Sequence, residues 1–572
     1  MKNKAFLFGC IVFPLILVIG FFVGFISSFK EGAGPSPKKV PSDAWLLLNP
    51  SAMIPDYNEM QPVRWFGSGM ISVEETVSKI MSAATDSRIK GMFIEPSYIQ
   101  TNYPALTEIG KAINVFKKSG KPVVAYGEMF SQADYLLASY ADEIFMEPSA
   151  SAGLILEGVS ANLMFYKELF DKLGIKMQIM QSGEYKGAGE PYSQTSLSPG
   201  TKSNIDAVLK DRYSLLLTGL AERRKLSIED INKIFEDRSD YFISAKTAKE
   251  MKLIDFPMGR DSTLARLELN NDRLISIADY SGSKPKAQKD KIAVVYLNGQ
   301  ITPGSSSDLT GQSGISAEKV RKTIELITKD KSIKATILRI NSPGGSALES
   351  EKIYQQLMQL RQSMPVVVSM GGVAASGGYY ISCASDYIVA DEATITGSIG
   401  VIMMLPETEG LGKKIGIRSQ TLKHGKFAGA FSVFESFDPA LIESLKRSST
   451  ATYDEFKARV ISARNYQTSN IDSVAEGRIF SAKAAKQNRL IDEIGTLDTA
   501  IAKACVLAGI SDYSTVSYPA KTSWLEALKN SDMLKVRNAI LKSKDPGVML
   551  EDHLRQLPTT GEWHYLMPYK LD

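Results

Sequence analysis

An internal repeat is the feature that most constrains how this chain can fold. The segment ISVEETVSKIMSAATDSRIKGMFIE begins at Ile71 and ISAEKVRKTIELITKDKSIKATILR begins at Ile315, and the two align without a gap. The offset is 244 residues (315 − 71), and the same offset pairs Asp142 with Asp386. Matches of this length indicate that the chain contains two copies of one domain.

The repeat divides the chain into five predicted parts. Two copies, residues 40–270 and 292–512, are joined by a polar linker over residues 281–291 with the sequence SGSKPKAQKDK. Residues 1–30 precede them, and a tail over residues 513–572 follows, without a counterpart at the end of the first copy. The segment SWLEALKNSDMLKVRNAILK predicts a helix in this tail, which is more typical of a packing element than of a site.

Each copy alternates short apolar runs with amphipathic stretches. In the second copy the runs IAVVYLNG, ATILRIN, PVVVSM and DYIVAD are rich in β-formers, which is typical of buried parallel strands. Between them, SAEKVRKTIELITKD and SALESEKIYQQLMQLRQS predict helices, and Ser316 is the expected N-cap of the first. This alternation predicts a layered α/β domain whose sites lie beyond the carboxyl ends of the strands.

An apolar run near the N-terminus is long enough to span a bilayer. It extends without a charge from Ala5 to Ile26, follows Lys2 and Lys4, and would reach ~33 Å as a helix. A cleaved signal peptide is the alternative, but the residues after the run offer no convincing cleavage site. We expect an uncleaved transmembrane anchor within residues 1–30, with its lysines in the cytoplasm and the rest of the chain outside.

Charge and cysteine content argue against several classes of protein. A net charge of +4 over 572 residues gives no electrostatic case for a nucleic-acid partner. The three cysteines are odd in number and far apart, and the three histidines form no metal-binding pair. We therefore expect no metal and no cofactor.

Four small-residue motifs are candidates for chemistry. INSPGGS places Gly344 and Gly345 between a strand and a helix, where backbone N–H groups suit an oxyanion hole, although a plain βα turn fits equally well. VAASGGYYIS contains Ser376, and its small residues also fit close helix packing. TGSIGV presents Ser398 between glycines, a setting that also forms ordinary turns. In the first copy, SGEYKGAGEPYS gives Lys186 small neighbours instead of charged ones.

Together these motifs resemble the signal peptide peptidase A (protease IV) family, in its long, membrane-anchored form with a duplicated domain. The resemblance spans residues 40 to about 512 together with the anchor. It implies an α/β fold of tandem Clp protease/crotonase-like domains, built from ββα spiral repeats, after one N-terminal transmembrane helix. It also implies a serine endopeptidase that degrades apolar peptides such as cleaved signal peptides. The enzyme would be a homo-oligomer, a tetramer, on the periplasmic side of the bacterial inner membrane.

The resemblance also implies roles for particular residues. Ser398 would be the nucleophile of a Ser-Lys dyad and Lys186 its general base, while Gly344 or Gly345 would hold the oxyanion. Ser419 in GIRSQT is the candidate hydroxyl that orients the lysine. At its usual pKa of ~10.4, only about one lysine in 2,500 is neutral at pH 7, so burial has to lower that pKa.

The repeat supplies a test of these roles that is independent of the family. Alignment of the copies places Leu154 opposite Ser398 and Ala428 opposite Lys186, so each copy keeps one half of the dyad. The first copy also has EPSYIQT in place of the SPGG loop, so its own oxyanion loop is lost. We therefore expect one composite site per chain, formed where the copies meet.

Three alternatives remain open. Ser376 occupies the place where Clp-type proteases carry their nucleophile, and His424, the one histidine in either copy, would be its base. A crotonase-like enzyme acting on acyl-CoA is the second, although an extracytoplasmic location argues against a cytosolic cofactor. An inactive scaffold is the third, and the intact pair of Ser398 and Lys186 disfavours it.

Overall fold

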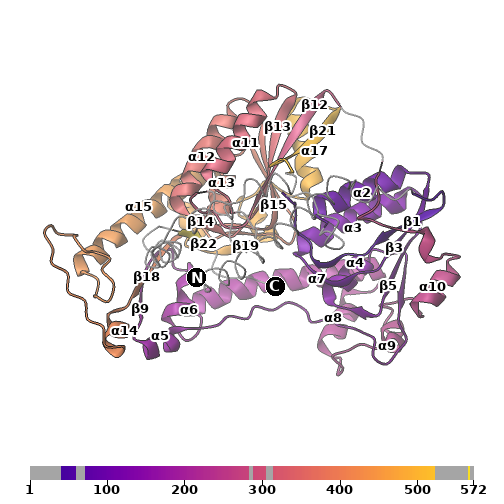
Figure 1. The fold of residues 1–572 in the computed structure, drawn as a ribbon, viewed down its shortest axis with the longest axis horizontal. Helices are drawn as coiled ribbons and strands as arrows, with labels where there is room; N and C mark the ends of the chain where they lie inside the picture. Colours follow the sequence, from indigo (N-terminus) through magenta and orange to yellow (C-terminus); the bar gives the residue numbers. More distant parts are fainter. Residues whose placement is uncertain (1–39, 60–70, 283–287, 305–313, 522–563, 567–572) are drawn as a thin grey trace, which may run out of the picture.

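The computed structural model describes residues 40–59, 71–282, 288–304, 314–521 and 564–566. Two α/β units, one from each copy, lie beside each other, and the helix α7 (Pro199–Arg224) extends from the first unit along the second (Figure 1). The predicted anchor over residues 1–30 lies outside the described residues. Among the described helices, none is long and apolar enough to cross a membrane.

The first unit is built on a parallel sheet with the order β10-β7-β5-β3-β1-β11. Its central strands are almost continuously buried, as expected for a sheet covered on both faces. The strands are β1 (Ala44–Leu48), β3 (Ile89–Ile94), β5 (Val123–Gly127), β7 (Glu143–Met146), β10 (Phe256–Pro257) and β11 (Leu274–Ser276). The main helices are α2 (Val73–Thr85), α3 (Tyr103–Lys118), α4 (Gln132–Ala138), α8 (Ile228–Glu236), α9 (Ala245–Glu250) and α10 (Arg260–Arg266). Two short parallel pairs complete it, β2 (Ser51–Met53) with β4 (Ser97–Gln100) and β6 (Met129–Phe130) with β8 (Gly153–Leu154).

The second unit repeats this plan around an eight-stranded sheet with the order β19-β17-β15-β13-β12-β21, in which β16 and β20 extend from β15. All of its strand pairs are parallel except β17 with β19. The strands are β12 (Asp290–Asn298), β13 (Ile333–Ser342), β15 (Val366–Ala375), β16 (Tyr387–Ala390), β17 (Ile395–Gly397), β19 (Ile479–Ser481), β20 (Glu493–Ile494) and β21 (Tyr513–Tyr518). The helices are α11 (Ala317–Lys329), α12 (Ala347–Arg361), α13 (Gly377–Ser382), α15 (Pro439–Arg464), α16 (Ala482–Gln487) and α17 (Leu497–Ala508).

The duplication seen in the sequence is also present in the structure. The helices α11 and α12 begin 244 residues after α2 and α3 (317 − 73 and 347 − 103), and the long helices α7 and α15 both have 26 residues. Ser316 caps α11, as predicted, by accepting a hydrogen bond from the Lys319 N–H.

The start of the predicted tail belongs to the second sheet. Residues 513–572 were expected to be a helical tail without a counterpart, but β21 lies in this range and pairs with β12, as β11 pairs with β1 in the first unit. A short strand at the end of each repeat extends the parallel sheet by one more edge strand. The helix predicted further along the tail lies outside the described residues.

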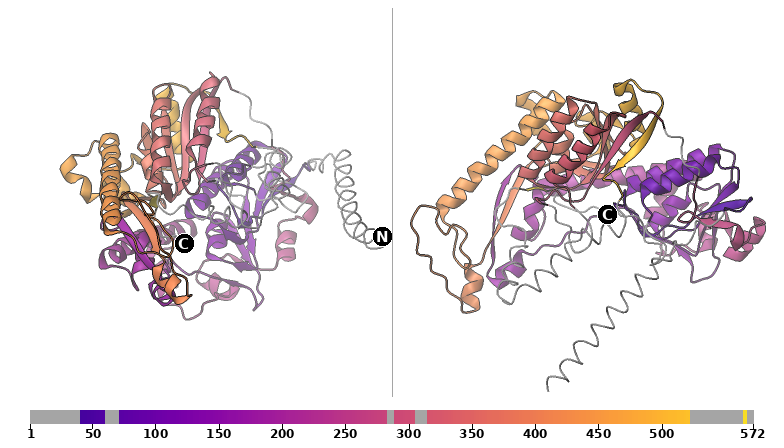
Figure 2. Two further views of the ribbon diagram at one scale, coloured as in Figure 1. Left: turned by 60° about the vertical axis from the view of Figure 1, so that its left-hand side comes forward. Right: turned by 45° about the horizontal axis from the view of Figure 1, so that its top comes forward.

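A third sheet joins the two copies. The strand β9 (Lys176–Ser182) of the first copy pairs antiparallel with β18 (Val401–Glu407) of the second, from Ser182 opposite Val401 to Lys176 opposite Glu407. Both strands extend into an arm that carries the short helices α5 (Lys167–Leu173) and α14 (Glu409–Lys414) at its end, at the lower left of Figure 1 and visible again in Figure 2. The β9–β18 ladder fixes the position of the segment after β9 relative to the segment before β18.

A buried charge cluster also lies between the copies. Arg339 of β13 forms ion pairs with Glu108 of α3, at 2.8 Å, and with Asp56, at 3.5 Å. All three side chains are almost completely shielded from solvent. Burial raises the pKa of Glu108 to about 7, although the Arg339 charge opposes that shift. A buried charge without a partner of opposite sign is strongly destabilising, so the two units have to dock in a way that keeps these ion pairs.

Candidate active site

Lys186 of the first copy reaches two serines of the second. It follows β9 and directly precedes a short 3-10 turn, η2 (Gly187–Gly189), and its side chain is completely buried. Its Nζ lies 2.9 Å from the Ser398 Oγ, 2.8 Å from the Ser398 carbonyl oxygen and 2.6 Å from the Ser376 Oγ. The structure therefore brings together the predicted pair of Lys186 and Ser398, and adds Ser376 as a third member.

Burial lowers the pKa of Lys186 well below its usual value, because an ammonium group loses its hydration there. A neutral amine has two N–H donors and one lone pair, which match the three contacts of Nζ. The Ser398 carbonyl oxygen can only accept, so one N–H donates to it. The second N–H donates to one serine hydroxyl, and the lone pair accepts the O–H of the other. One of the two serines is thus placed to give up its proton to the amine.

Ser376 lies at the junction between β15 and α13 in a backbone conformation that side chains rarely adopt. Its φ and ψ are 56° and −116°, and its side chain does not cap the helix it precedes. Strained residues of this kind cluster at functional sites. The hydroxyl is free of a capping role and lies against Lys186 instead.

The first copy provides an internal comparison for Ser376. Ser131 precedes α4, which corresponds to α13, but has ordinary φ and ψ angles of −66° and 168°. It forms a capping box, in which its Oγ accepts from the Asp134 N–H and its own N–H donates to the Asp134 carboxylate at 3.0 Å; its Oγ also donates to that carboxylate at 2.6 Å. A serine at the start of this helix is structural in the first copy, whereas in the second it contacts a buried amine.

Ser398 is held in place through its backbone. It has a φ of 53° and follows Gly397, whose φ is 82°. Its N–H donates to the Arg478 carbonyl oxygen at 2.6 Å. Both its hydroxyl and its carbonyl oxygen are within hydrogen-bond distance of the Lys186 Nζ, so Ser398 positions the amine through two contacts.

Gly477 is a component of the site that sequence analysis missed. The segment around it connects Lys186 with Ser398, because the Gly477 N–H donates to the Ile399 carbonyl oxygen and the Tyr185 N–H donates to the Glu476 carbonyl oxygen. A Cβ atom at Gly477 would lie 2.5 Å from the Lys186 backbone nitrogen, and its φ is 79°. Apart from being a glycine, it had no sequence signal that could have pointed to this contact.

The two glycines predicted to hold the oxyanion differ in the contacts that their backbone atoms make. The Gly344 N–H donates to the Ser342 Oγ at 3.1 Å, so this group is already engaged. Gly345 lies so close to Ile301 that a Cβ atom would be 1.9 Å from its carbonyl oxygen. The strand β14 (Gly344–Ser346) lies beside the start of α13, where a Cβ atom on Gly377 would be 3.2 Å from the Gly344 Cα. N–H groups in the first turn of a helix have no partner within that helix, which makes Gly377 a candidate donor that sequence analysis did not name.

Two other predicted residues lie away from the lysine. Ser419, expected to orient Lys186, is exposed in the segment after α14. His424, the base required by the Ser-His alternative, is exposed in the same segment, whereas Ser376 is completely buried. The prediction for Ser419 was therefore wrong, since Ser376 and Ser398 supply the hydroxyls at the amine. The pairing of Ser376 with His424 was also wrong, because the partner of Ser376 is Lys186.

The corresponding region of the first copy is closed. The Asp134 carboxylate accepts hydrogen bonds from the N–H groups of Tyr98 and Ile99, at 3.1 and 3.0 Å. These residues belong to EPSYIQT, the segment that replaces the SPGG loop. A protein carboxylate therefore occupies the N–H groups that a substrate oxyanion would need, which leaves one composite site among the described residues.

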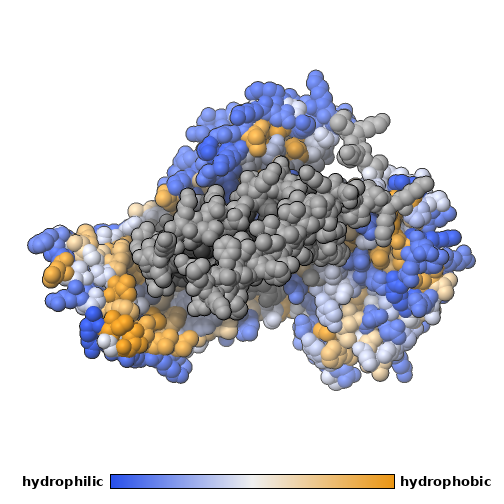
Figure 3. Space-filling view, viewed as in Figure 1, coloured by the Kyte–Doolittle hydropathy of each residue, from blue (hydrophilic) through white to orange (hydrophobic). Residues whose placement is uncertain are grey.

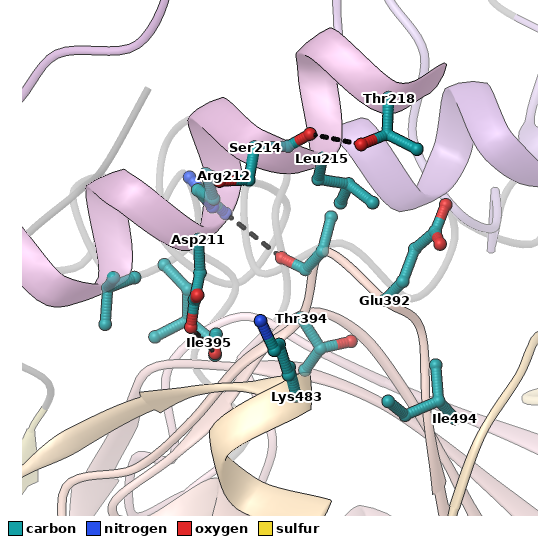
Figure 4. Close-up of a pocket in the computed structure, with 13 residues that line it drawn as sticks. Asp211, Arg212, Ser214, Leu215, Thr218, Glu392, Thr394, Ile395, Lys483 and Ile494 are labelled. Carbon is teal, nitrogen blue, oxygen red and sulfur yellow. Dashed lines mark hydrogen bonds between the residues drawn. The ribbon is translucent and has the colours of Figure 1, made fainter. Parts of the chain in front are cut away.

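A cavity of about 290 Å³ lies between α7 and the second unit (Figure 4). Arg212 of α7 and Thr394 and Lys483 of the second copy line it. None of Lys186, Ser376 and Ser398 lines this cavity, so it is separate from the candidate site.

Comparisons with known proteins show the family to which the chain is related. The model of peptidase family S49 matches residues 115–273 and 358–511, one segment in each copy, and a Clp protease model matches residues 310–395. Protease 4 of Haemophilus influenzae is 33% identical over 534 residues, covering 86% of this chain and 85% of the relative. The chloroplastic serine protease SPPA of Arabidopsis thaliana is 32% identical over 458 residues, covering 78% and 67%. A putative signal peptide peptidase SppA of Enterococcus faecium is 31% identical over 245 residues, covering 42% and 71%.

Proposed function

This chain belongs to peptidase family S49 and is a serine peptidase of α/β, Clp-like fold, and on that premise we propose that Ser376 is its nucleophile and Lys186 its general base. In this proposal Ser398, which sequence analysis named as the nucleophile, positions the lysine, and Ser376 takes the role of nucleophile. The observation that carries it is the fully buried amine of Lys186, 2.6 Å from a serine hydroxyl held in a strained backbone.

The geometry supports a two-step acyl transfer. As the Ser376 Oγ attacks the carbonyl carbon of a peptide bond, its proton passes to the lone pair of the Lys186 Nζ. The N–H groups of Gly345 and Gly377 are the candidate donors to the oxyanion, because β14 and the start of α13 lie next to each other beside Ser376. The Lys186 ammonium then gives its proton to the leaving amine of the substrate. The neutral Lys186 Nζ is again a base, and it activates the water that hydrolyses the acyl-enzyme.

Ser398 is better suited to hold the lysine than to attack. Its hydroxyl and carbonyl oxygen both contact Nζ, so the amine is tethered to one residue at two points and turned toward Ser376. The oxygen of a nucleophile gives up its hydrogen bond with the base when it forms an ester with the substrate. Ser376 can do so while the two hydrogen bonds between Lys186 and Ser398 stay intact.

Matched alanine variants separate the two serines. With an apolar fluorogenic peptide, Ser376→Ala should lower kcat/KM by at least about 1,000-fold, the scale for loss of a nucleophile. Ser398→Ala should lower it by about 10- to 100-fold, because the carbonyl oxygen still accepts from Nζ and only one positioning bond is lost. Mass spectrometry of acid-quenched enzyme should locate the acyl group on Ser376.

Ser398 remains the second candidate nucleophile, because its Oγ is also within hydrogen-bond reach of Nζ. An acyl group found on Ser398, together with residual turnover in Ser376→Ala, would exchange the roles again. A Ser-His mechanism requires that His424→Ala abolish turnover, and we expect that variant to remain active.

We further propose that the enzyme acts on apolar peptides such as cleaved signal peptides, from the extracytoplasmic side of a bacterial inner membrane. The apolar run from Ala5 to Ile26 supports an anchor, and the name of the Enterococcus relative supports this substrate class. Externally added protease should degrade the two folded units in spheroplasts, where the outer face of the inner membrane is accessible, but not in intact cells. Protection from external protease would contradict this orientation.

We also propose that the chain forms a homo-oligomer, which the family resemblance suggests is a tetramer. Apolar side chains gather on the arm near α5 and α14 (Figure 3), where Ile415, Leu422, Phe431 and Val433 are exposed. Exposed apolar patches of this kind are typical of protein interfaces. Light scattering of the detergent-solubilised chain should give a multiple of the 62.6 kDa monomer mass, and a monomer would refute it.

A further inference from the structure

A strand from the C-terminal end of the chain lies inside the third sheet. The strand β22 (His564–Leu566) separates β14 from β18, in the order β14-β22-β18-β9. It pairs antiparallel with β14, with Gly344 opposite Leu566 and Gly345 opposite Tyr565. On its other side it pairs antiparallel with β18, where Ile402 lies opposite His564. Figure 1 shows β22 directly beside β14.

The position of β22 coincides with the proposed catalytic groups. Gly345, a candidate oxyanion donor, is one of its pairing residues, and β22 also contacts α13, the helix that begins directly after Ser376. With β22 in place, neither the Ser376 nor the Lys186 side chain has exposed surface. A peptide substrate has to come within bonding distance of Ser376, so it needs the space beside β14 and α13 that β22 takes.

Backbone pairing also explains how a peptide would be held there. Without β22, β14 and β18 would present facing strand edges, one strand apart, and an extended peptide binds to such edges through main-chain hydrogen bonds. Recognition of this kind depends little on the side chains of the bound segment. The chain's own C-terminal strand and a foreign peptide are therefore ligands of the same chemical class.

We propose that β22 is an intramolecular inhibitor that occupies the peptide-binding groove between β14 and β18 and competes with substrate. This inference rests on the proposed peptidase site. Tethering makes the competition strong, since a covalently attached segment acts at an effective concentration on the order of millimolar. A free tail peptide with an inhibition constant of about 100 μM would then correspond to about tenfold suppression in the intact chain.

The test compares four forms of the full protein. A chain that ends at Thr560 lacks β22, and Tyr565→Pro keeps the tail but removes a backbone N–H in the middle of the strand. Both should raise kcat/KM for an apolar peptide at least about fivefold, mainly through a lower apparent KM. Thr559→Pro places the same residue type before β22 and should behave as the wild type.

A second readout uses the tail itself. A synthetic peptide of residues 561–572, GEWHYLMPYKLD, should inhibit the chain that ends at Thr560 competitively. An unchanged or lower kcat/KM in both the truncated chain and Tyr565→Pro would overturn the proposal, as would an absence of competition by the peptide.

Binding separates this inference from the proposed function. Fluorescence anisotropy of the labelled 561–572 peptide, with a Lys186→Met chain that ends at Thr560, needs no turnover. Saturable binding that a proline at the Tyr565 position of the peptide abolishes supports the groove even if no variant cleaves peptides. If the truncated enzyme is active and the labelled peptide does not bind, the inhibitor role is refuted while the peptidase stands.

Discussion

Substitution of Gly477 tests whether exclusion of water is what makes Lys186 a base. In Gly477→Ala, the new Cβ atom would lie 2.5 Å from the Lys186 nitrogen, 2.7 Å from its Cα and 2.8 Å from its Cβ. These atoms are backbone or fixed to it, so the segment that carries Lys186 has to move away. The displacement separates Nζ from the two serines and admits water to the amine, which raises its pKa toward the usual value.

The size of the effect follows from the free energy of protonation. Each unit by which the Lys186 pKa rises corresponds to ~1.36 kcal/mol, or a tenfold smaller neutral fraction below that pKa. The rise in the Lys186 pKa should therefore lower kcat/KM at pH 7, by about tenfold for each unit by which that pKa comes to lie above 7. The loss should shrink as the pH rises, because a higher pH deprotonates the amine again. The left-handed conformation, with a φ of 79° at Gly477, adds ~1–2 kcal/mol of destabilisation for alanine.

The assay is a pH profile of kcat/KM beside a thermal melt. Gly509→Ala is the matched control, because Gly509 has a φ of 65° but no heavy atom within 4 Å of its would-be Cβ atom. Both variants should lose stability, and only Gly477→Ala should move the midpoint of the pH profile upward. A wild-type midpoint in Gly477→Ala, or an equal shift in Gly509→Ala, would refute the reasoning.

Two further predictions concern buried charge. Lys186→Met should abolish turnover but raise Tm at pH 7, because the wild-type lysine, whose pKa burial depresses, must lose on folding the proton that the unfolded chain keeps up to about pH 10.4. That gain should shrink as the pH approaches 10, so a Tm difference independent of pH would contradict the depressed pKa. Burial raises the pKa of Glu108 to about 7, so its contribution to stability is complete below about pH 4.3 and is lost as the pH rises through 7. Melts of Glu108→Gln between pH 5 and 8 should therefore show a flatter dependence of Tm on pH than the wild type, and an unchanged slope would exclude Glu108 as its source.

The sequence predicted those parts of the fold that local pattern and the repeat determine. The alternation of apolar runs and helices predicted the sheet of each unit. The family resemblance predicted the pair of Lys186 and Ser398, and the alignment of the copies predicted that each copy keeps one half of it. The first and the last of these depend on residues near each other in the chain or on the alignment of the copies. The pairing of Lys186 with Ser398 at 2.9 Å agrees with that prediction.

What the sequence could not predict depends on contacts between distant segments. Ser376 lies 190 residues from Lys186, and its hydroxyl reaches the amine through the docking of the two copies, to which the β9–β18 ladder contributes. Ser419 follows β18 by few residues, but the chain leaves the sheet after α14 and carries it to the surface. The engagement of the Gly344 N–H by Ser342 is likewise a matter of geometry that no motif encodes.

The burial of Lys186 has a consequence for the life of the protein before it is folded. An unfolded chain, or one whose copies have not yet docked, leaves this amine in water, where nearly all of it is protonated and useless as a base at neutral pH. Proteolytic capacity therefore arises only with the last stage of assembly, when both copies close around the amine. Docking of the two copies is therefore a requirement for activity, and a chain that has not reached it lacks a working base.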